Sequence, residues 1–356
     1  MNLACTSEID ETEYERFLDG FAWQPGAALA YHYPFYMRFL SDVAYPGSTR
    51  RFVTARNAEG ALTGVLPALH VKTASVSAWM SLAYFGPNGG ALVRDASTPE
   101  GAAAVRALVA DAKLDAQARG CRSMTMYTPL NARAEDYRAG FGRPDFEIER
   151  VSQVLSLSED AGQAPWPRKV RYDVRRAAAL GVTVRPIATQ EELDTVWRIY
   201  RGNCEGADIP LKALEHVRCL YRTAASHGLF LLAEHGGAIV AGLIGLIGGG
   251  VLSYYLPCTR AEARPMQPGL LLLDDAVTRA RAAGCRLLNF ESSPGVDSSV
   301  YQFKERCGGV PVPYRVFVAL LAPQALDEYK TLAADGLRRE APHAFIVPFT
   351  ALARGV

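Results

Sequence analysis

The sequence lacks paired cysteines. Its seven cysteines are scattered and contain no C-x-x-C spacing, so neither a disulfide framework nor a zinc knuckle is predicted. The six histidines form no motif, and His216 with Cys219, at helical spacing, is more typical of helix packing than of half a metal site. We therefore expect no metal, a reducing compartment and a cytoplasmic location. The cysteines are Cys5, Cys121, Cys204, Cys219, Cys258, Cys285 and Cys307.

An excess of charge and a long apolar run are also missing. Lys and Arg number 38 against 37 Asp and Glu, which excludes a global basic field for nucleic acid and leaves room only for a local patch. The longest apolar run, residues 238–252, is rich in glycine and shorter than the about 20 residues of a membrane-spanning helix. We interpret it as a pair of buried strands. The acidic residues 1–20 do not resemble a secretory signal, so none is expected.

The chain contains an internal repeat. With 356 residues and 49% hydrophobic content it is long enough for two domains. Residues 107–122 (ALVADAKLDAQARGCR) match residues 271–286 (LLLDDAVTRARAAGCR) at a constant offset of 164. Residues 52–69 resemble residues 230–247 at an offset of 178. Duplication explains this better than chance similarity between alanine-rich helices, because the same order of elements occurs twice.

The residue pattern of each copy predicts three strands, a helix and a returning strand. The first two strands flank the turns Glu59-Gly60 and Gly236-Gly237, which is hairpin chemistry. Each helix ends at a glycine, as a left-handed C-terminal cap prefers. No G-x-G-x-x-G follows the first strand, which argues against a mononucleotide-binding fold. We therefore predict an α+β (mixed α/β) chain with a central mixed β-sheet in each of two domains.

Composition marks a boundary between the copies. Residues 156–167 (SLSEDAGQAPWP) contain Ser, Gly, Asp and two prolines, which is typical of a linker. We predict an N-terminal domain over residues 1–155, a linker over residues 156–167 and a C-terminal domain over residues 168–356.

A basic segment follows the linker. Residues 168–181 (RKVRYDVRRAAALG) predict a helix with valines on one face and cations on the others. Arg171 and Arg175 are four residues apart, so together they could grip one phosphate or carboxylate. A solvated helix face explains the pattern equally well. The position at the start of the second copy favours an anion site in a cleft between domains.

Glu291 and Lys304 are the candidate catalytic residues. Glu291 ends a predicted strand before Ser-Ser-Pro-Gly, where a partly buried carboxylate could act as a general base or simply cap the next turn. Lys304 lies in SSVYQFKERCGG, residues 298–309, a predicted short helix that a glycine pair ends. Periodicity alone fits an ordinary exposed lysine. No Ser-His-Asp or Cys-His constellation is visible, so an acyl-enzyme is not expected.

Three segments together resemble the FemAB-type transferases. They are the basic segment, the motif Phe303-Lys304-Glu305 before a glycine pair, and the loop YFGPNGG at residues 84–90. The resemblance covers most of residues 30–315, and F-K-x-x-x-G-G is its most specific element. This family is built from two GNAT-like domains, which agrees with the repeat. Its members transfer an aminoacyl group from aminoacyl-tRNA to an amine on a peptidoglycan precursor or a small natural product, forming an amide.

The resemblance implies a role for five residues and no further cofactor. Lys304 would stabilise the negative charge that develops as the ester is attacked, and Phe303 would line the site beside it. Arg171 or Arg175 would hold the phosphate of a small amine acceptor. Arg38 would be a second basic residue on the same acceptor.

Two departures leave the donor open. The chain has no long heptad stretch, so a coiled-coil arm for tRNA docking is not predicted. Acyl-CoA members carry an R-x-x-G-x-G/A pyrophosphate loop, whereas this chain has RPMQPGL at residues 264–270, in which Pro268 removes an amide donor. The leading prediction is an aminoacyltransferase. The alternatives are an acyltransferase using acyl-CoA or acyl carrier protein, and a noncatalytic ligand-binding module.

Overall fold

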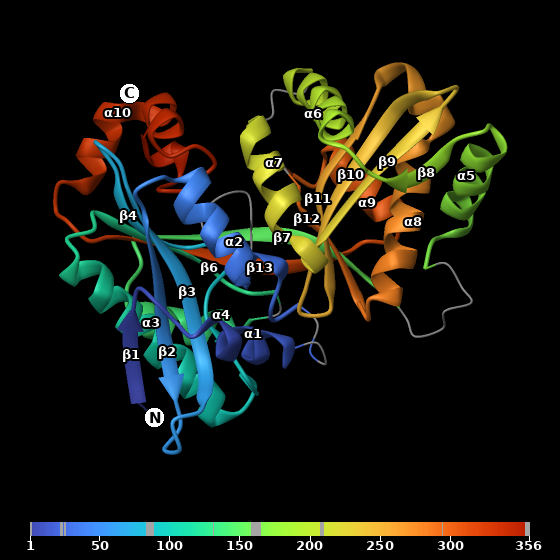
Figure 1. Ribbon diagram of the computed structural model, residues 1–356. Helices are drawn as coiled ribbons and strands as arrows, with labels where there is room; N and C mark the ends of the chain where they lie inside the picture. Colours follow the sequence, from blue (N-terminus) through green and yellow to red (C-terminus); the bar gives the residue numbers. More distant parts are fainter. Residues whose placement is uncertain are drawn as a thin grey trace. The chain divides into compact units, whose positions relative to one another are not determined.

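The chain forms two compact units in this computed structural model (Figure 1). Unit 1 comprises residues 1–21, 31–150 and 313–356, and unit 2 comprises residues 22–30 and 151–312. The structure describes residues 2–21, 24, 26–82, 89–130, 132–157, 165–206, 210–293 and 295–352. Of the predicted loop at residues 84–90, only the two glycines at its end fall within these ranges.

Unit 1 contains a mixed sheet with the strand order β1-β2-β3-β4-β6-β13, and β5 pairs with β3. Neighbouring strands are antiparallel except β4 and β6, which are parallel and are connected through α3. Its elements are β1 (Asn2–Thr6), α1 (Glu11–Asp19), α2 (Pro34–Phe39), β2 (Thr49–Arg56), β3 (Leu62–Lys72), β4 (Ser77–Ser81), β5 (Leu92–Val93), α3 (Pro99–Ala118), β6 (Ser123–Tyr127), α4 (Ala134–Phe141), β13 (Val310–Leu320), α10 (Ala325–Glu340) and η5 (Phe349–Leu352).

Unit 2 repeats this pattern with the strand order β8-β9-β10-β11-β12-β7. Its strands are antiparallel except β11 and β12, which are parallel and are connected through α8. Its elements are β7 (Phe146–Ser156), α5 (Arg168–Ala179), β8 (Thr183–Pro186), α6 (Gln190–Glu205), α7 (Leu214–Thr223), β9 (Gly228–His235), β10 (Ala238–Gly248), β11 (Val251–Thr259), η4 (Ala261–Met266), α8 (Pro268–Ala282), β12 (Leu287–Ser292) and α9 (Ser299–Arg306).

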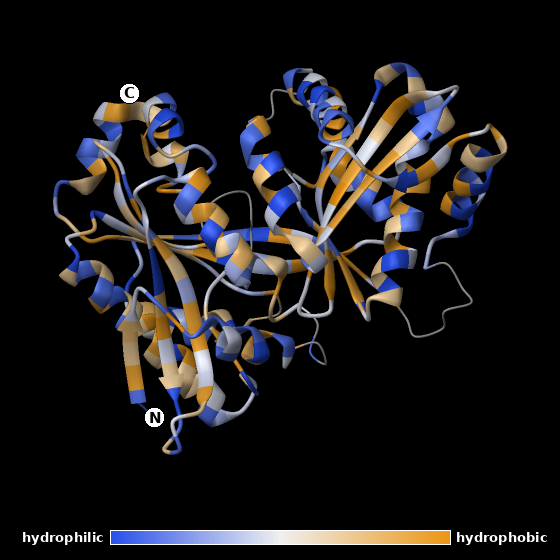
Figure 2. Cartoon of the chain, viewed as in Figure 1, coloured by the Kyte–Doolittle hydropathy of each residue, from blue (hydrophilic) through white to orange (hydrophobic). Residues whose placement is uncertain are grey.

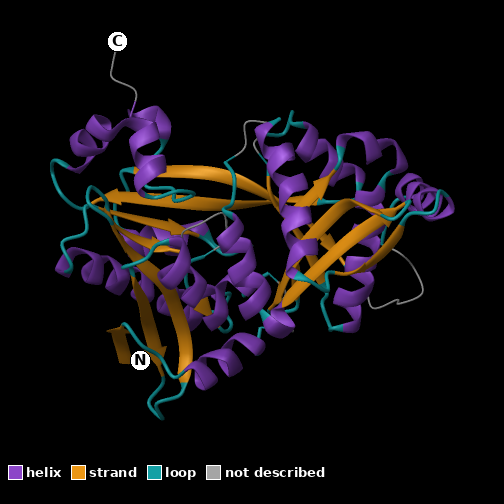
Figure 3. Cartoon of the chain, turned by 45° about the horizontal axis from the view of Figure 1, so that its top comes forward, coloured by secondary structure: helices purple, strands orange, loops and turns teal. Residues whose placement is uncertain are grey.

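The equal strand orders confirm the predicted fold class and the recurring order of elements. The predicted turns at Gly60 and Gly237 join β2 to β3 and β9 to β10, and both glycines have positive φ, at 84° and 78°. The crossover helices α3 and α8 are followed by Gly120 and Gly284, with φ of 64° and 82°, as predicted for helix ends. Figure 3 shows helices packed against the strands within each unit.

The division of the chain differs from the predicted boundaries. A single linker over residues 156–167 was expected, but residues 22–30 belong to unit 2 and residues 313–356 belong to unit 1. The reason is strand pairing: β13, from the end of the chain, pairs with β6, whereas β7, from the middle, pairs with β12. Residues 158–164 of the predicted linker lie outside the described residues.

Each unit has its own apolar core beside its crossover helix. In unit 1, Leu108 and Val109 of α3 are fully buried with residues of β2, β3 and β6. In unit 2, Leu273 and Ala276 of α8 are fully buried with residues of β9 to β12 and with α5. Apolar colour follows β9 and β10 in Figure 2. These cores explain why alanine-rich helices recur at the same place in both copies.

Candidate functional site

The sheet of unit 2 has two faces of different chemistry. Along β12, Leu288 and Phe290 belong to the core beside α8, so Asn289 between them lies on the opposite face. Helix α6 covers that opposite face, because a side chain at Gly242 of β10 would collide with Val196 of α6. We call the two sides the α8 face and the α6 face. The α6 face carries the polar groups.

Glu291 is held on the α6 face by a buried polar cluster. The Asn289 side chain accepts hydrogen bonds from the Ser152 hydroxyl at 2.9 Å and from the Glu291 backbone N–H at 3.0 Å. Its amide nitrogen donates to the Glu291 carboxylate at 3.1 Å. Glu291 has a left-handed φ of 65°, a conformation that is rare for residues other than glycine and that recurs at functional sites. The cluster therefore fixes both the backbone and the carboxylate of Glu291.

The bent backbone at Glu291 presents two carbonyl groups to Lys304. The Lys304 ammonium donates to the carbonyl oxygens of Glu291 at 3.0 Å and Ser292 at 2.8 Å. The side chain is only 4% exposed, and this burial lowers its pKa from 10.5 to about 8, although the Glu291 carboxylate acts in the opposite direction. Two of its three N–H donors are used in the described part of the chain, which leaves one for a bound molecule.

Lys212 is a second buried lysine, which sequence reasoning missed. Its ammonium lies 4.6 Å from the centre of the Tyr255 ring, and the residue is 7% exposed. Burial lowers its pKa from 10.5 to about 8, and Cys204 and Glu291 act against this decrease. Trp197 of α6 donates to its carbonyl oxygen at 2.9 Å. No motif marks this lysine, because its burial beneath α6 is a tertiary effect.

The hydroxyl of Ser253 adds a further polar group to this face. Ser253 of β11 pairs with Asn289 of β12, and it is fully buried. Its hydroxyl has no hydrogen-bond partner among the residues that the structure describes. A buried hydroxyl without a partner costs free energy, and such groups recur at binding sites. The α6 face thus joins two lysines, a carboxylate and two hydroxyls.

The equivalent face in unit 1 is filled by the chain itself. Thr125 of β6 corresponds to Asn289 at the repeat offset, and its hydroxyl donates to the backbone oxygen of Ile346 at 3.3 Å. Ser123 of the same strand lies 2.9 Å from the Tyr329 hydroxyl. Both partners come from the C-terminal segment that follows β13. In unit 1 this segment therefore covers the sheet face whose counterpart in unit 2 carries the polar groups.

The remaining predicted residues do not join Glu291 and Lys304. Phe303 is half-buried against the core on the α8 face, with the Arg306 guanidinium 5.6 Å from its ring centre. Arg171 and Arg175 are exposed on α5, whose buried valines pack into the same core. They therefore lie on the side of the sheet opposite the Glu291 carboxylate. Their assignment to the acceptor's phosphate stays a prediction.

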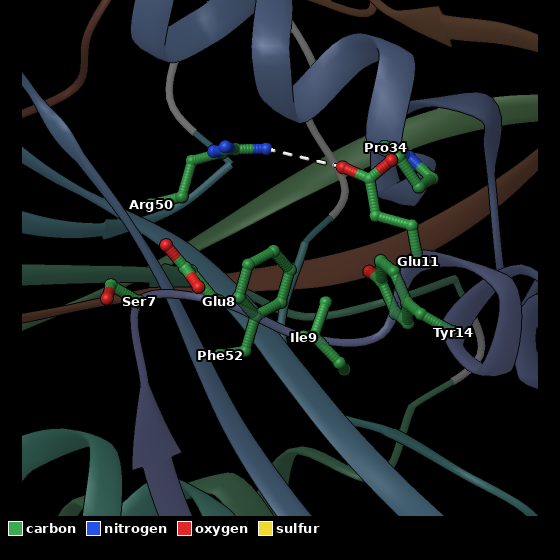
Figure 4. A pocket seen from close by; sticks show the side chains of 8 residues that line it. All are labelled: Ser7, Glu8, Ile9, Glu11, Tyr14, Pro34, Arg50 and Phe52. Atoms are coloured by element: carbon green, nitrogen blue, oxygen red, sulfur yellow. Dashed lines mark ion pairs between the residues drawn. The ribbon is translucent and has the colours of Figure 1, made fainter.

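Arg38 belongs to unit 1, where it forms an ion pair with Glu11. Glu11 also lies 3.6 Å from Arg50 and lines a hollow of about 250 Å³ (Figure 4). Arg38 does not line this hollow, whose residues are Ser7, Glu8, Ile9, Glu11, Tyr14, Pro34, Arg50 and Phe52. The residues that line this hollow include no lysine, unlike the site of unit 2, where the buried Lys304 lies beside Glu291.

The start of α8 offers few amide donors to a phosphate. Pro268 at the first helical position has no N–H, and the Leu270 N–H donates to the carbonyl oxygen of Gln267 at 3.1 Å. In unit 1 the side chain of Thr98 caps α3 by accepting from the Gly101 N–H at 3.1 Å. In each crossover helix one amide of the first turn is thus absent because of a proline, and another is already hydrogen-bonded, which leaves fewer donors than an open anion site would have.

Neither a metal cluster nor a membrane helix is found in the described part of the chain. No group of three or more His, Cys, Asp or Glu residues within the described ranges is placed to hold a metal ion. None of the described helices has the length and apolar character that crossing a membrane requires.

Comparison with known proteins identifies the domain type. Residues 167–305, within unit 2, match the family described as acetyltransferase (GNAT) domain. FemX has a similar structure, with a TM-score of 0.69 and 14% identity, covering 88% of this chain and 97% of FemX. A tandem GNAT protein from the clavulanic acid biosynthesis pathway follows, with a TM-score of 0.54 and 15% identity over 90% of this chain and 99% of its own.

A third similar structure is the C-terminal domain of a putative lysylphosphatidylglycerol synthetase from Agrobacterium fabrum. Its TM-score is 0.53 at 11% identity, covering 95% of this chain and 100% of that domain. A search of curated protein sequences finds no match. At such identities the structural likeness is one of fold. Unit 2 therefore contains a GNAT-type acetyltransferase domain, and the fold of the chain is similar to those of FemX and of a tandem GNAT protein.

Proposed function

We propose that this protein transfers an aminoacyl group from aminoacyl-tRNA to the amine of a small-molecule or peptidoglycan-precursor-like acceptor in the cytoplasm. The observation that carries the proposal is Lys304, a buried ammonium held by two carbonyl oxygens beside Glu291. An ordinary exposed lysine, the simplest expectation from sequence, would have neither this burial nor these partners. A buried lysine with a lowered pKa marks a candidate site for chemistry.

The third N–H of Lys304 suits the transition state of aminolysis. As the amine attacks the ester carbonyl, negative charge develops on the carbonyl oxygen, and a preorganised donor stabilises it. The two backbone carbonyls fix the ammonium before substrate arrives, so little reorganisation is needed during the reaction. The C–N bond forms as the ester C–O bond to ribose breaks.

Glu291 would manage the proton of this reaction. The attacking amine loses a proton, which the Glu291 carboxylate would accept and return to the departing ribose oxygen. Asn289 orients this carboxylate through its amide nitrogen at 3.1 Å. Lys212 adds a second ammonium close enough to interact with the same carboxylate, and it could also balance an anionic group of the acceptor. Arg38 remains proposed as an acceptor-binding residue, which requires that an acceptor displace Glu11.

The helix N-termini favour a tRNA donor over CoA. A CoA pyrophosphate is usually bound by free amides at the start of the crossover helix. Pro268 and the bonded Leu270 amide leave few such donors at α8. An aminoacyl ester on a ribose does not need this cradle. The resemblance of the sequence to the FemAB-type transferases, whose members use aminoacyl-tRNA, supports the same choice.

A second candidate is transfer from acyl-CoA or a carrier-bound thioester. The family match to an acetyltransferase domain favours it, and so does the likeness to a tandem GNAT protein whose structure is described with reference to AcCoA. The same oxyanion donor would serve a thioester. A noncatalytic ligand-binding module is the third candidate, and the buried Lys304 beside the partly buried Glu291 argues against it.

Purified protein would be incubated with charged tRNA pools and candidate amines. We expect release of uncharged tRNA that depends on the amine, with no comparable reaction from acetyl-CoA. Absence of turnover with every charged tRNA, together with calorimetric binding of CoA, would replace the proposal with the second candidate. Acceptor binding without turnover from any donor would favour the binding module.

A further inference from the structure

Helix α5 presents an arginine stripe that no other part of the described chain neutralises. Arg168, Arg171 and Arg175 follow the i, i+3, i+7 spacing, which places them on one helix face. All three are exposed and form no ion pair with any residue in the described ranges. Like charges at this spacing repel one another, so the stripe lowers helix stability unless an anion binds it. Many other arginines among the described residues have a carboxylate partner, as Arg185 and Arg218 do.

The stripe has an exposed aromatic ring at its centre. Tyr172 lies next to Arg171 and within one turn of Arg168 and Arg175, and it is 59% exposed. Cations interleaved with an exposed aromatic ring are the arrangement that proteins use to bind RNA, where arginines contact phosphates and the ring stacks on a base. Lys169 and Arg176 add two more exposed cations to the helix.

The stripe starts beside the segment that carries Lys304. A Cβ at Gly308, just after α9, would lie 3.6 Å from Pro167, which immediately precedes α5. Phe303 of α9 and Val170 of α5 belong to the same apolar cluster. From this end, the 12 residues of α5 extend over about 18 Å. A long anion on α5 would therefore have one end near α9.

We propose that the exposed face of α5 is the docking surface for the RNA of the aminoacyl-tRNA donor, an inference that rests on the proposed function. Three arginines along seven residues of helix span about 10 Å, which suits successive backbone phosphates better than the one phosphate of a small acceptor. The face lies on the α8 side, so it leaves the α6 face of the site to the acceptor. The surface also explains how a chain of balanced net charge could bind RNA, through one local patch.

An anionic membrane is the weaker occupant. A helix that binds a membrane surface inserts an apolar face between lipids. Of the apolar residues of α5, Val170, Val174 and Ala177 are buried in unit 2, and the exposed Ala178 and Ala179 offer only methyl groups. Only Tyr172 projects a large apolar group from the exposed face of this helix.

The test measures binding of an uncharged acceptor-stem minihelix RNA to the full chain between 50 and 300 mM salt. The variant Arg168→Gln/Arg171→Gln/Arg175→Gln removes the stripe and keeps helix-forming residues. Loss of three phosphate contacts should flatten the slope of log K against log salt by about 2 to 3 and weaken binding by on the order of 100-fold at 0.15 M salt. The matched control, Arg16→Gln/Arg143→Gln/Arg339→Gln, removes the same charge from exposed sites of unit 1 and should change binding by less than about threefold.

Further variants separate a contact surface from a general charge effect. Replacing the three arginines of the stripe by lysine keeps the charge, so the salt slope should be retained. Tyr172→Ala should weaken binding by roughly 5- to 100-fold with no change in slope, as expected for loss of one stacked base. Equal losses in the stripe variant and the unit-1 control would overturn the proposal in favour of nonspecific attraction.

Two further results would also overturn the proposal. If the stripe variant bound RNA as well as the wild-type protein, the exposed face of α5 would be an ordinary solvated helix face. Unchanged RNA binding with lost binding to vesicles of phosphatidylglycerol and phosphatidylcholine would mean a membrane surface. Because the minihelix is uncharged, this test is independent of catalysis. RNA binding that needs α5 but no transfer would reject the proposed function alone, and transfer that ignores α5 would reject this surface alone.

Discussion

Replacement of Lys304 by methionine is the most direct test of the site. Methionine has a similar length and apolar stem but no ammonium, so the two hydrogen bonds to the carbonyl oxygens of Glu291 and Ser292 are lost. The residue is 4% exposed, and no ion pair with it is found in the described ranges. The change therefore removes one charge and its donors with little change in packing.

The expected effects on stability nearly cancel. A lysine pKa lowered from 10.5 to about 8 means that holding the charge in the folded protein costs roughly 3 kcal/mol relative to water. Removing it relieves this cost, but two carbonyl oxygens lose a donor, at about 1 to 3 kcal/mol each if water does not replace it. We expect the free energy of unfolding to change by less than about 3 kcal/mol in urea titration, with cooperative unfolding retained.

The expected effect on catalysis is much larger. Loss of one oxyanion donor typically costs about 2.7 to 4 kcal/mol, which corresponds to roughly 100- to 1,000-fold in kcat. Single-turnover transfer from charged tRNA would measure it. The wild-type rate should fall as pH rises through about 8, because Lys304 then loses its proton, and the methionine variant should lack this alkaline limb.

Lys212→Met is the matched control for this prediction. Lys212 has a similarly lowered pKa of about 8 and comparable burial, but it lies over the Tyr255 ring and not at the Glu291 carbonyl. Equal losses of kcat in both variants would mean that any buried charge suffices, which contradicts an oxyanion role specific to Lys304. A Lys304→Met protein that transfers at the wild-type rate, or one that no longer folds, would refute the reasoning.

Three further predictions concern stability. Asp115→Asn should lower the free energy of unfolding by about 3 to 5 kcal/mol in urea titration, because Asp115 pairs at 2.6 Å with Arg51, which is 4% exposed; a loss below about 1 kcal/mol would contradict this. Gly249→Ala should cost more than about 2 kcal/mol, since its added Cβ would lie 2.2 Å from a backbone oxygen, whereas Gly236→Ala, with equal φ but open space, should cost about 1 kcal/mol. The free energy of unfolding should rise between pH 8 and 10.5, where the unfolded chain binds more protons, and part of this rise should vanish in Lys304→Met; equal slopes would contradict the lowered pKa.

The site was predictable where its residues are neighbours along the chain. Glu291 was selected from its place at the end of a predicted strand, and Lys304 from a short motif on the next helix that resembles the FemAB-type transferases. The structure brings the two residues together. Lys212 comes from a different part of the chain, and no local pattern distinguishes it from an exposed lysine. Its importance arises only when α6 and Tyr255 exclude water from its ammonium.

The basic segment illustrates the same limit. Its helix, its exposed cations and its terminating glycine all follow from composition and 3.6-residue periodicity. Which side of the sheet the helix covers depends on the core that its valines enter, and those partners are distant in sequence. The expectation of a cleft between domains could not specify this side. The structure places Arg171 and Arg175 opposite the Glu291 carboxylate.

The sequence by itself determined the local elements, the duplication and the α+β class, because turns, helix ends and apolar periodicity are properties of short segments. Only the tertiary structure decided that β13 completes unit 1 and β7 completes unit 2, since a strand's own pattern does not name its partner. It also decided that the C-terminal segment fills the face of unit 1 that remains polar in unit 2. Two similar copies thus acquire different chemistry through what packs on them.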